Sequence, residues 1–241
     1  MMHGWALRSM ATQLPQVWRF KDSRDARVVI AIVDYGRGNL GSVRKALARV
    51  GSEVVITDDR HVVERAGALV VPGDGAFADA MQSLAGLGLL EPLRAHIQAG
   101  RPYLGICLGY QLLFAESEEF GHAKGLGILP GVVRRFPAGL KVPHMGWNQL
   151  RVPGRDAARP AIVAGVPDGA YFYFVHSYYP DSADLEGCAV GTCEYGVTFP
   201  ALLVRGTLCG TQFHQEKSQR WGLRLLENFA ALAGRAGEAA V

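Results

Sequence analysis

The hydrophobic pattern of the chain changes about halfway along its length. In the first half, short continuous apolar runs alternate with stretches in which apolar residues recur at helical spacing. The runs predict buried strands of a parallel sheet at residues 28–35, 53–57, 68–73 and 101–107. The intervening stretches predict helices at residues 42–50, 76–84 and 89–99. Strands that alternate with helices favour an α/β fold with a doubly wound, mostly parallel sheet.

The second half is richer in strand-forming residues that are separated by Gly and Pro. Its apolar and aromatic runs lie at residues 132–136, 171–179, 189–195 and 199–205. These runs predict antiparallel strands that are added to the main sheet or packed on it. A last helix is predicted at residues 222–233. Because no repeat or low-complexity linker interrupts the chain, residues 28–241 are predicted to form one domain.

Residues 1–27 differ from the rest of the chain. They have no clear period and lack the 7–15-residue apolar core of a secretory signal. We expect a flexible N-terminal extension outside the domain. A docking arm that uses Trp5 and Trp18 is the alternative.

The composition excludes several classes of protein. Of the 241 residues, 49% are hydrophobic and 20% are charged, as in ordinary globular chains. A net charge of +3 does not indicate a nucleic-acid partner, and no apolar stretch is long enough for a membrane helix. The four cysteines contain no Cys-x-x-Cys pair, which argues against a zinc ribbon or a disulfide scaffold. The sequence therefore predicts a cytoplasmic protein without a nucleic-acid or membrane partner.

The strongest local signal for chemistry is the run G-I-C-L-G at residues 105–109. An apolar strand ends on Cys107 and a helix is predicted immediately after it, which is the pattern of a nucleophile elbow. The positive end of the helix would favour a thiolate, and the Leu108 N–H would point toward a developing oxyanion. The alternative is a buried structural cysteine.

A thiolate nucleophile needs a base that can also protonate the leaving group. Of the seven histidines, His214 is the best placed, because it follows the apolar run 199–205. Glu216 lies two residues further on, and in an extended chain positions i and i+2 share a face. Cysteine, histidine and an orienting acid are the three parts of an acyl-transfer site.

Two glycine-rich turns allow more than one interpretation. P-G-D-G at residues 72–75 could turn a backbone N–H toward an oxyanion, or could be an ordinary strand-to-helix turn. G-R-G-N-L-G at residues 36–41 has glycines at the spacing of a dinucleotide fingerprint, and Asp58 and Asp59 follow the second strand. A nucleotide-binding module is therefore a rival hypothesis.

Two further runs, at residues 141–150 and 171–179, are dense in aromatic residues and histidine. Such runs form a sheet face or line a protein interface. His144, His176 and His214 are too widely separated in the sequence to show the spacing of metal ligands. We predict no metal and no cofactor.

Together these runs closely resemble the class I (triad) glutamine amidotransferases, from about residue 28 to residue 232. The class shares G-I-C-L-G and F-H-x-E. More narrowly, the chain is similar to the family of glutaminase subunits of imidazole glycerol phosphate synthase. That similarity is carried by V-D-Y-G-x-G-N-L, K-V-P-H-M-G-W-N-Q-L, Y-F-Y-F-V-H-S-Y-Y and Q-F-H-Q-E-K-S-Q.

The resemblance implies roles for individual residues. Cys107 would attack the side-chain amide of L-glutamine, His214 would move the protons, and Glu216 would hold the tautomer of His214. The oxyanion would be met by Leu108 and by the segment of Gly73 and Asp74. The residues that match the glutamine pocket are Gly75, Gln111, Ser177 and Tyr178.

The resemblance also implies a partner. Ammonia would pass to a (β/α)₈-barrel cyclase subunit, which forms imidazole glycerol phosphate and aminoimidazole carboxamide ribotide in histidine biosynthesis. The heterodimer would thus combine hydrolase and lyase activities. The residues that match the subunit interface are Asn39, Trp147, Tyr173 and Lys217.

Two positions depart from the family pattern. Asp74 stands where relatives carry a small apolar residue, and an acid that pointed at the thiolate would raise the cysteine pKa. Gln215 stands where relatives usually carry proline, and the loss of that constraint could loosen the pairing of His214 with Glu216.

Two alternative functions within the class remain. One is a glutaminase subunit that feeds anthranilate, pyridoxal phosphate or purine synthesis, against which H-M-G-W-N argues. The other is a catalytically impaired regulatory relative, against which the intact residues Cys107, His214 and Glu216 argue.

Overall fold

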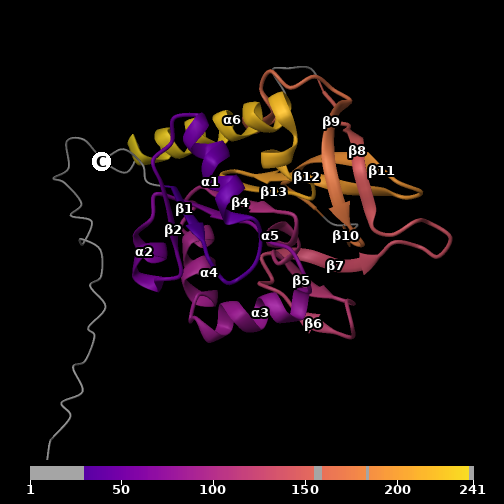
Figure 1. Cartoon of the computed structure of the whole chain (residues 1–241), viewed down its shortest axis with the longest axis horizontal. Helices are drawn as coiled ribbons and strands as arrows, with labels where there is room; N and C mark the ends of the chain where they lie inside the picture. Colours follow the sequence, from indigo (N-terminus) through magenta and orange to yellow (C-terminus); the bar gives the residue numbers. More distant parts are fainter. Residues whose placement is uncertain (1–29, 155–158, 183–184, 239–241) are drawn as a thin grey trace, which may run out of the picture.

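A computed structural model describes residues 30–154, 159–182 and 185–238 (Figure 1). The predicted extension at residues 1–27 lies outside the described residues. Among the described residues, no helix is long and apolar enough to cross a membrane.

A seven-stranded sheet forms the centre of the molecule. Five neighbouring strands are parallel, and two antiparallel strands complete one edge. In spatial order the parallel strands are β2 (Val54–Thr57), β1 (Ile30–Val33), β3 (Ala68–Val71), β4 (Tyr103–Ile106) and β13 (Leu208–Thr211). The antiparallel strands are β12 (Thr198–Arg205) and β11 (Ala189–Glu194). This arrangement confirms the predicted mostly parallel sheet with added antiparallel strands.

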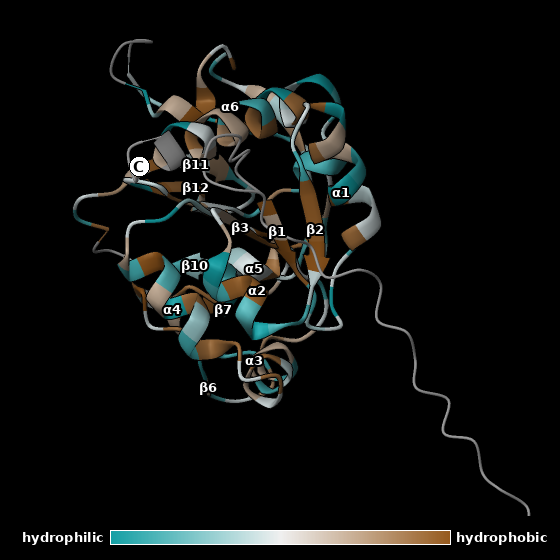
Figure 2. Ribbon diagram, turned by 90° about the vertical axis from the view of Figure 1, so that its left-hand side faces the viewer, coloured by the Kyte–Doolittle hydropathy of each residue, from teal (hydrophilic) through white to brown (hydrophobic). Residues whose placement is uncertain are grey.

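Helices cover both faces of this sheet (Figure 1). On one face lie α1 (Leu40–Arg49) and α6 (Gln219–Glu238), and on the other lie α2 (Arg60–Arg65), α3 (Phe77–Gly86) and α4 (Leu90–Gln98). Ile30 and Ile32 of β1 pack in the core under α1 and α6, whereas Ala31 and Val33 pack in the core under α2, α3 and α4. Figure 2 shows the hydrophobic strands β1 and β2 beside helices whose other faces are hydrophilic. Because the sheet is covered on both faces, the sequences of these strands are continuous apolar runs.

The remaining strands form two smaller sheets. One has the order β10-β7-β5-β6, and the other pairs β8 with β9. Their bounds are β5 (Phe114–Ser117), β6 (Ala123–Lys124), β7 (Leu129–Arg135), β8 (His144–Leu150), β9 (Ala170–His176) and β10 (Tyr178–Asp181), with the short 3-10 helix η2 (Ala161–Val163) between β8 and β9. The predicted run 171–179 is thus divided at Ser177 between two sheets.

Strand β13 corrects one expectation from the sequence. The sequence predicts no strand between the apolar run 199–205 and His214, but β13 lies between them and pairs with β4 in parallel. Thr211 is opposite Ile106, so the two strands end side by side. Because of this register, Cys107 and His214 both emerge from the carboxyl edge of the sheet.

Candidate active site

Cys107 occupies the sharp turn between β4 and the helix α5 (Leu108–Gln111). Its φ of 54° lies in the left-handed region, which a residue with a side chain rarely adopts. The neighbouring glycines leave no room for side chains: a Cβ on Gly105 would lie 2.6 Å from the Gly109 carbonyl oxygen, and a Cβ on Gly109 would overlap the Val71 carbonyl. The turn therefore has the geometry of a nucleophile elbow. The helix is only four residues long, and β5 begins three residues after its end.

His214 and Glu216 form the second half of the triad. The two side chains meet between Nδ1 and Oε1 at 2.8 Å, and the Glu216 side chain is only 2% exposed. The sequence predicts this contact from an extended chain, but Glu216 lies in the 3-10 helix η3 (Gln215–Lys217). The predicted contact between His214 and Glu216 is confirmed, but the predicted extended chain is wrong. A turn of 3-10 helix brings the carboxylate to the ring.

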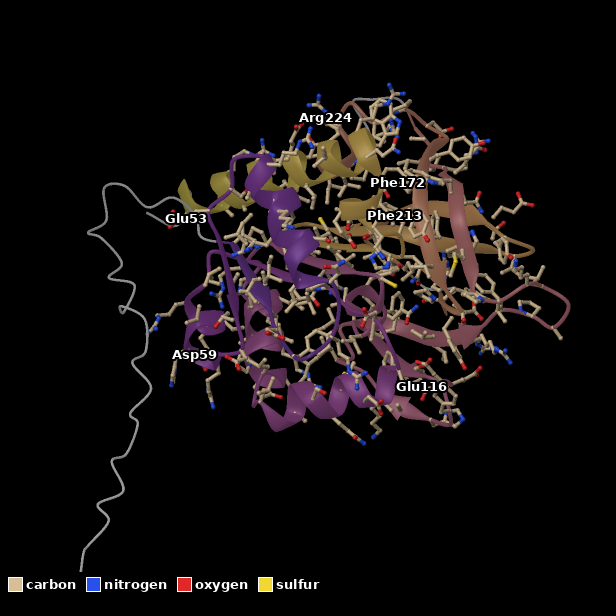
Figure 3. The ribbon with its side chains drawn as sticks, viewed as in Figure 1. Glu53, Asp59, Glu116, Phe172, Phe213 and Arg224 are labelled. Carbon is tan, nitrogen blue, oxygen red and sulfur yellow. The ribbon has the colours of Figure 1, made fainter. Side chains whose placement is uncertain are left out.

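The segment that carries His214 is packed firmly onto β9. The rings of Phe172 and Phe213 lie side by side, with centroids 4.1 Å apart (Figure 3). The His214 N–H donates to the Tyr173 carbonyl at 3.0 Å, and the Ser218 hydroxyl donates to the His214 carbonyl. These contacts fix the backbone from which the imidazole projects.

Gln215, the departure from proline, is also held. Its side chain is buried and its Nε2 donates to the Thr211 hydroxyl. The pairing of His214 with Glu216 is therefore intact without proline at this position.

The charge state of His214 follows from its neighbours. Burial lowers the pKa of the imidazole, but the Cys107 thiolate and the Glu216 carboxylate outweigh burial and raise the pKa to about 10. Nε2 of His214 is buried and has no hydrogen-bond partner of good geometry among the described residues, although the charge of Cys107 reaches it. The His214 ring is therefore charged at neutral pH and lies beside the Cys107 sulfur, where it can donate a proton to a departing group.

A cavity of about 380 Å³ opens in front of Cys107. Its size suits a small polar ligand. It brings together most of the predicted site residues from distant elements, namely Asn39, Asp74, Gly75, Cys107, Leu108, Gln111, Ser177, Tyr178, His214 and Lys217. A larger cavity of about 590 Å³, beside Trp147 and Trp221, contains no triad residue.

The segment 72–75 runs directly beside the elbow. A Cβ on Gly73 would lie 2.8 Å from the Leu108 Cβ and would overlap the Tyr35 hydroxyl. That hydroxyl donates to the Pro72 carbonyl at 2.7 Å. No hydrogen bond of the described residues uses the Leu108 N–H, so it is open to an incoming oxyanion.

The Asp74 carboxylate is bound by the backbone that precedes α1. It accepts the Gly38 N–H at 3.0 Å, and the Ser42 N–H donates to the Asn39 side chain at 3.1 Å. Two N–H groups at the start of α1 are thus already bound by side chains of this chain. This arrangement argues against the rival nucleotide site at residues 36–41.

The sequence did not predict four residues that line the cavity, namely Glu119, Pro143, Val175 and His176. The Glu119 carboxylate accepts the Phe77 N–H at 2.7 Å, and burial raises the pKa of Glu119. Glu119 lies in an irregular loop, and no periodicity of the sequence marks it. His176 is directly opposite His144 in the β8–β9 pair, and their imidazole nitrogens are 2.9 Å apart.

The histidine pair differs from His214 in charge. Burial lowers the pKa of His144 to about 4 and the pKa of His176 to about 3, so both rings are neutral. Among the described residues, no group of three or more His, Cys, Asp and Glu side chains could hold a metal ion.

The four residues that match the partner interface gather near the cavity. The rings of Trp147 and Tyr173 are 6.1 Å apart, and the Lys217 ammonium lies 5.8 Å from the centre of the Tyr173 ring. Trp147 is 46% exposed, which is unusual for so large an apolar side chain. Asn39 and Lys217 line the cavity itself.

Comparison with known proteins adds independent evidence. The family model for glutamine amidotransferase class-I matches residues 31–232. The chain is 53% identical over 211 residues to a protein of Moorella thermoacetica named imidazole glycerol phosphate synthase subunit HisH, covering 87% of this chain and 98% of that protein. It is 50% identical over 210 residues to the protein of the same name from Geobacter sulfurreducens, covering 84% and 98%.

Solved structures show the same fold. A crystal structure of a glutamine amidotransferase matches with a TM-score of 0.66 at 24% identity, covering 86% of this chain and 99% of that one. A glutamine amidotransferase from Thermotoga maritima matches with a TM-score of 0.59 at 19% identity, covering 82% and 80%.

Proposed function

The chain belongs to the class I glutamine amidotransferase family, and from this premise we propose that it acts as the glutaminase subunit of imidazole glycerol phosphate synthase. The observation that carries the proposal is the assembled triad of Cys107, His214 and Glu216 in a chain about 50% identical to subunits of that name. Its own reaction is the hydrolysis of glutamine to glutamate and ammonia.

The geometry supports a two-step mechanism. The Cys107 thiolate attacks the side-chain carbonyl of glutamine, and the new oxyanion accepts the Leu108 N–H and an N–H of the segment 73–74. The His214 imidazolium gives its proton to the departing nitrogen, which leaves as ammonia. His214, now neutral, takes a proton from water as that water attacks the thioester. Glutamate leaves, and the thiolate and the imidazolium are restored.

The cavity would orient the substrate through Gly75, Gln111, Ser177 and Tyr178. Ammonia would pass to the (β/α)₈-barrel cyclase subunit, and the lyase step belongs to that partner. The exposed Trp147 with Asn39, Tyr173 and Lys217 would form part of the contact. We place this reaction in residues 28–241 and in the cytoplasm.

The test is glutamate release from glutamine, measured with and without the cyclase subunit and its ribonucleotide ligand. We expect the wild-type chain to be slow alone and fast in the complex, and Cys107→Ala to be inactive in both. Cys188→Ala is the matched control, because Cys188 is only partly buried and lies outside the cavity. A complex that releases no Cys107-dependent glutamate would overturn the proposal.

A further inference from the structure

Gln212 has no role in the mechanism above, yet its side chain reaches the nucleophile. It follows β13, is fully buried, and lies two residues before His214. Its Nε2 is 3.7 Å from the Cys107 sulfur, and its Oε1 is 3.0 Å from Nε2 of Gln111. A buried amide with both ends engaged has a defined orientation.

The direction of each hydrogen bond follows from the Tyr178 carbonyl. A carbonyl only accepts, so the atom of Gln111 that lies 2.9 Å from it must be the amide nitrogen. The second hydrogen of that nitrogen is directed at Gln212, whose facing atom must therefore be the acceptor Oε1. The Nε2 of Gln212 is consequently turned toward the Cys107 sulfur.

A second set of hydrogen bonds also ends at the Tyr178 carbonyl. Nδ1–H of His176 donates to the Tyr178 carbonyl at 2.8 Å, so the neutral ring presents Nε2 as an acceptor. Nδ1–H of His144 donates to that nitrogen at 2.9 Å, and Nε2 of His144 accepts from the Asn148 amide at 3.2 Å. Two runs of hydrogen bonds thus meet at the Tyr178 carbonyl, which accepts from both. One begins at Asn148 in β8, and the other connects Gln111 through Gln212 to the sulfur, although Gln212 and Cys107 are 105 positions apart.

The groups around the sulfur show why a hydrogen-bond donor matters there. A further polar contact of the sulfur is the Val175 carbonyl at 4.0 Å. A thiol can donate to that carbonyl, but a thiolate cannot, and the carbonyl dipole disfavours negative charge. The Gln212 N–H and the His214 imidazolium are the donors that favour it.

We propose that Gln212 is a further catalytic residue, whose Nε2–H donates to the Cys107 sulfur and favours the thiolate. The donation acts before attack on glutamine and again when the thiolate leaves the acyl-enzyme. No proton leaves Gln212 in either step. Gln111 and the Tyr178 carbonyl are positioning residues that orient the amide. The part played in turnover rests on the proposed glutaminase function, whereas the hydrogen bond to sulfur does not.

The test is the rate at which iodoacetamide alkylates Cys107 at pH 7 in the full chain without glutamine or partner. Mass spectrometry follows the Cys107 peptide, with the Cys188 peptide as an internal reference. Gln212→Met removes the donor at similar size and should slow labelling about tenfold. Gln212→Glu keeps an acceptor toward Gln111 but turns a carboxylate oxygen toward sulfur, so it should be slower still. Gln98→Met, on the exposed end of α4, should label like the wild type.

A purely structural role predicts a different result. In that case both Gln212 variants would lower thermal stability while Cys107 of the folded protein labelled at the wild-type rate, and the proposal would be wrong. If Gln212→Glu does not fold, Gln212→Met alone decides. In the complex we also expect Gln212→Met to lower kcat and to leave KM within about twofold, because the contact is to sulfur and not to substrate.

The two proposals can fail separately. A wild-type complex that releases no glutamate, but whose labelling depends on Gln212, would refute the glutaminase function alone. If the complex is active, and Gln212→Met changes neither the labelling rate of Cys107 nor kcat, only the role of Gln212 is refuted.

Discussion

Two buried histidine sites lie near Cys107, and one is charged at neutral pH whereas the other is neutral. His214 after β13 has its pKa raised to about 10, whereas His144 and His176 in the β8–β9 pair have their pKa values lowered to about 4 and 3. All three side chains are less than 10% exposed. Burial alone therefore does not set the charge of a histidine in this protein.

The difference lies in the hydrogen-bond partners. His214 faces the Glu216 carboxyl and the Cys107 sulfur, and the electrostatic effect of both groups raises the pKa of His214. His176 faces a carbonyl and a second imidazole, which satisfy its hydrogen bonds without a compensating charge. One site is thus equipped to move protons, and the other to hold a fixed tautomer.

Glu216→Gln should remove most of the charge difference between the two histidine sites. The substitution keeps an acceptor for Nδ1 but removes the charge, so the pKa of His214 should fall. We expect kcat for glutamate release in the complex to drop by about 10²–10³. Glu227→Gln, in an exposed ion pair on α6, is the control and should remain active. A kcat within twofold of the wild type would show that the carboxylate charge has no part in catalysis.

The neutral pair should appear in the acid dependence of stability. Because the folded pKa of His144 lies below its unfolded value near 6.5, the unfolded chain binds the proton first, and stability is lost as pH falls from about 6.5 toward 4. His144→Phe removes this loss. Between pH 7 and pH 5, the free energy of unfolding should fall in both proteins. The fall should be smaller in the variant, and the difference between the two falls should be on the order of 2 kcal/mol.

Chemical denaturation at the two pH values measures this difference. His122→Phe, at an exposed histidine, should behave like the wild type. Equal losses for wild type and His144→Phe would mean that the pair titrates as it does in the unfolded chain.

His214 should show the opposite sign in alkali. Its folded pKa is raised, so its contribution is fully present below about 6.5 and is lost as pH rises toward about 10. Glu216→Gln lowers that pKa, so the stability advantage of the wild type over the variant should shrink between pH 7 and 10, by about 1 kcal/mol. Denaturation curves of both proteins between pH 7 and 10 measure this difference in stability. A difference that stays constant over the range would contradict the prediction.

Gln215→Pro should change stability and glutamate release very little. Proline suits the first position of a helical turn and reduces the entropy of the unfolded chain, while the hydrogen bond to Thr211 is lost. We expect stability within about 0.5 kcal/mol of the wild type and unchanged glutamate release. Gln215→Ala, which loses the hydrogen bond without that gain, should cost about 1 kcal/mol. A large loss of activity in Gln215→Pro would show that residue 215 positions His214.

Much of the parallel sheet could be predicted because each strand is a local apolar run bounded by turn residues. The elbow at Cys107 could be predicted for the same reason, since strand, glycines and helix are contiguous. Strand β13 and helix α2 escaped prediction. Strand β13 is a four-residue run, L-C-G-T, that contains glycine and threonine, and α2 has one buried residue, Val63. Glu119 escaped because its position in the cavity depends on the path of a loop.

By itself, the sequence determined the strands and helices of the parallel sheet and the sharp turn that carries Cys107, since each depends on a pattern within about ten residues. The tertiary structure alone decided that Asp74 turns to Gly38, that His144 and His176 stay neutral, and that Gln212 faces the sulfur. Each of these outcomes depends on a partner that is tens to a hundred residues away in the chain. The charge and orientation of a polar side chain are set by the groups that surround it, and folding is what brings those groups together.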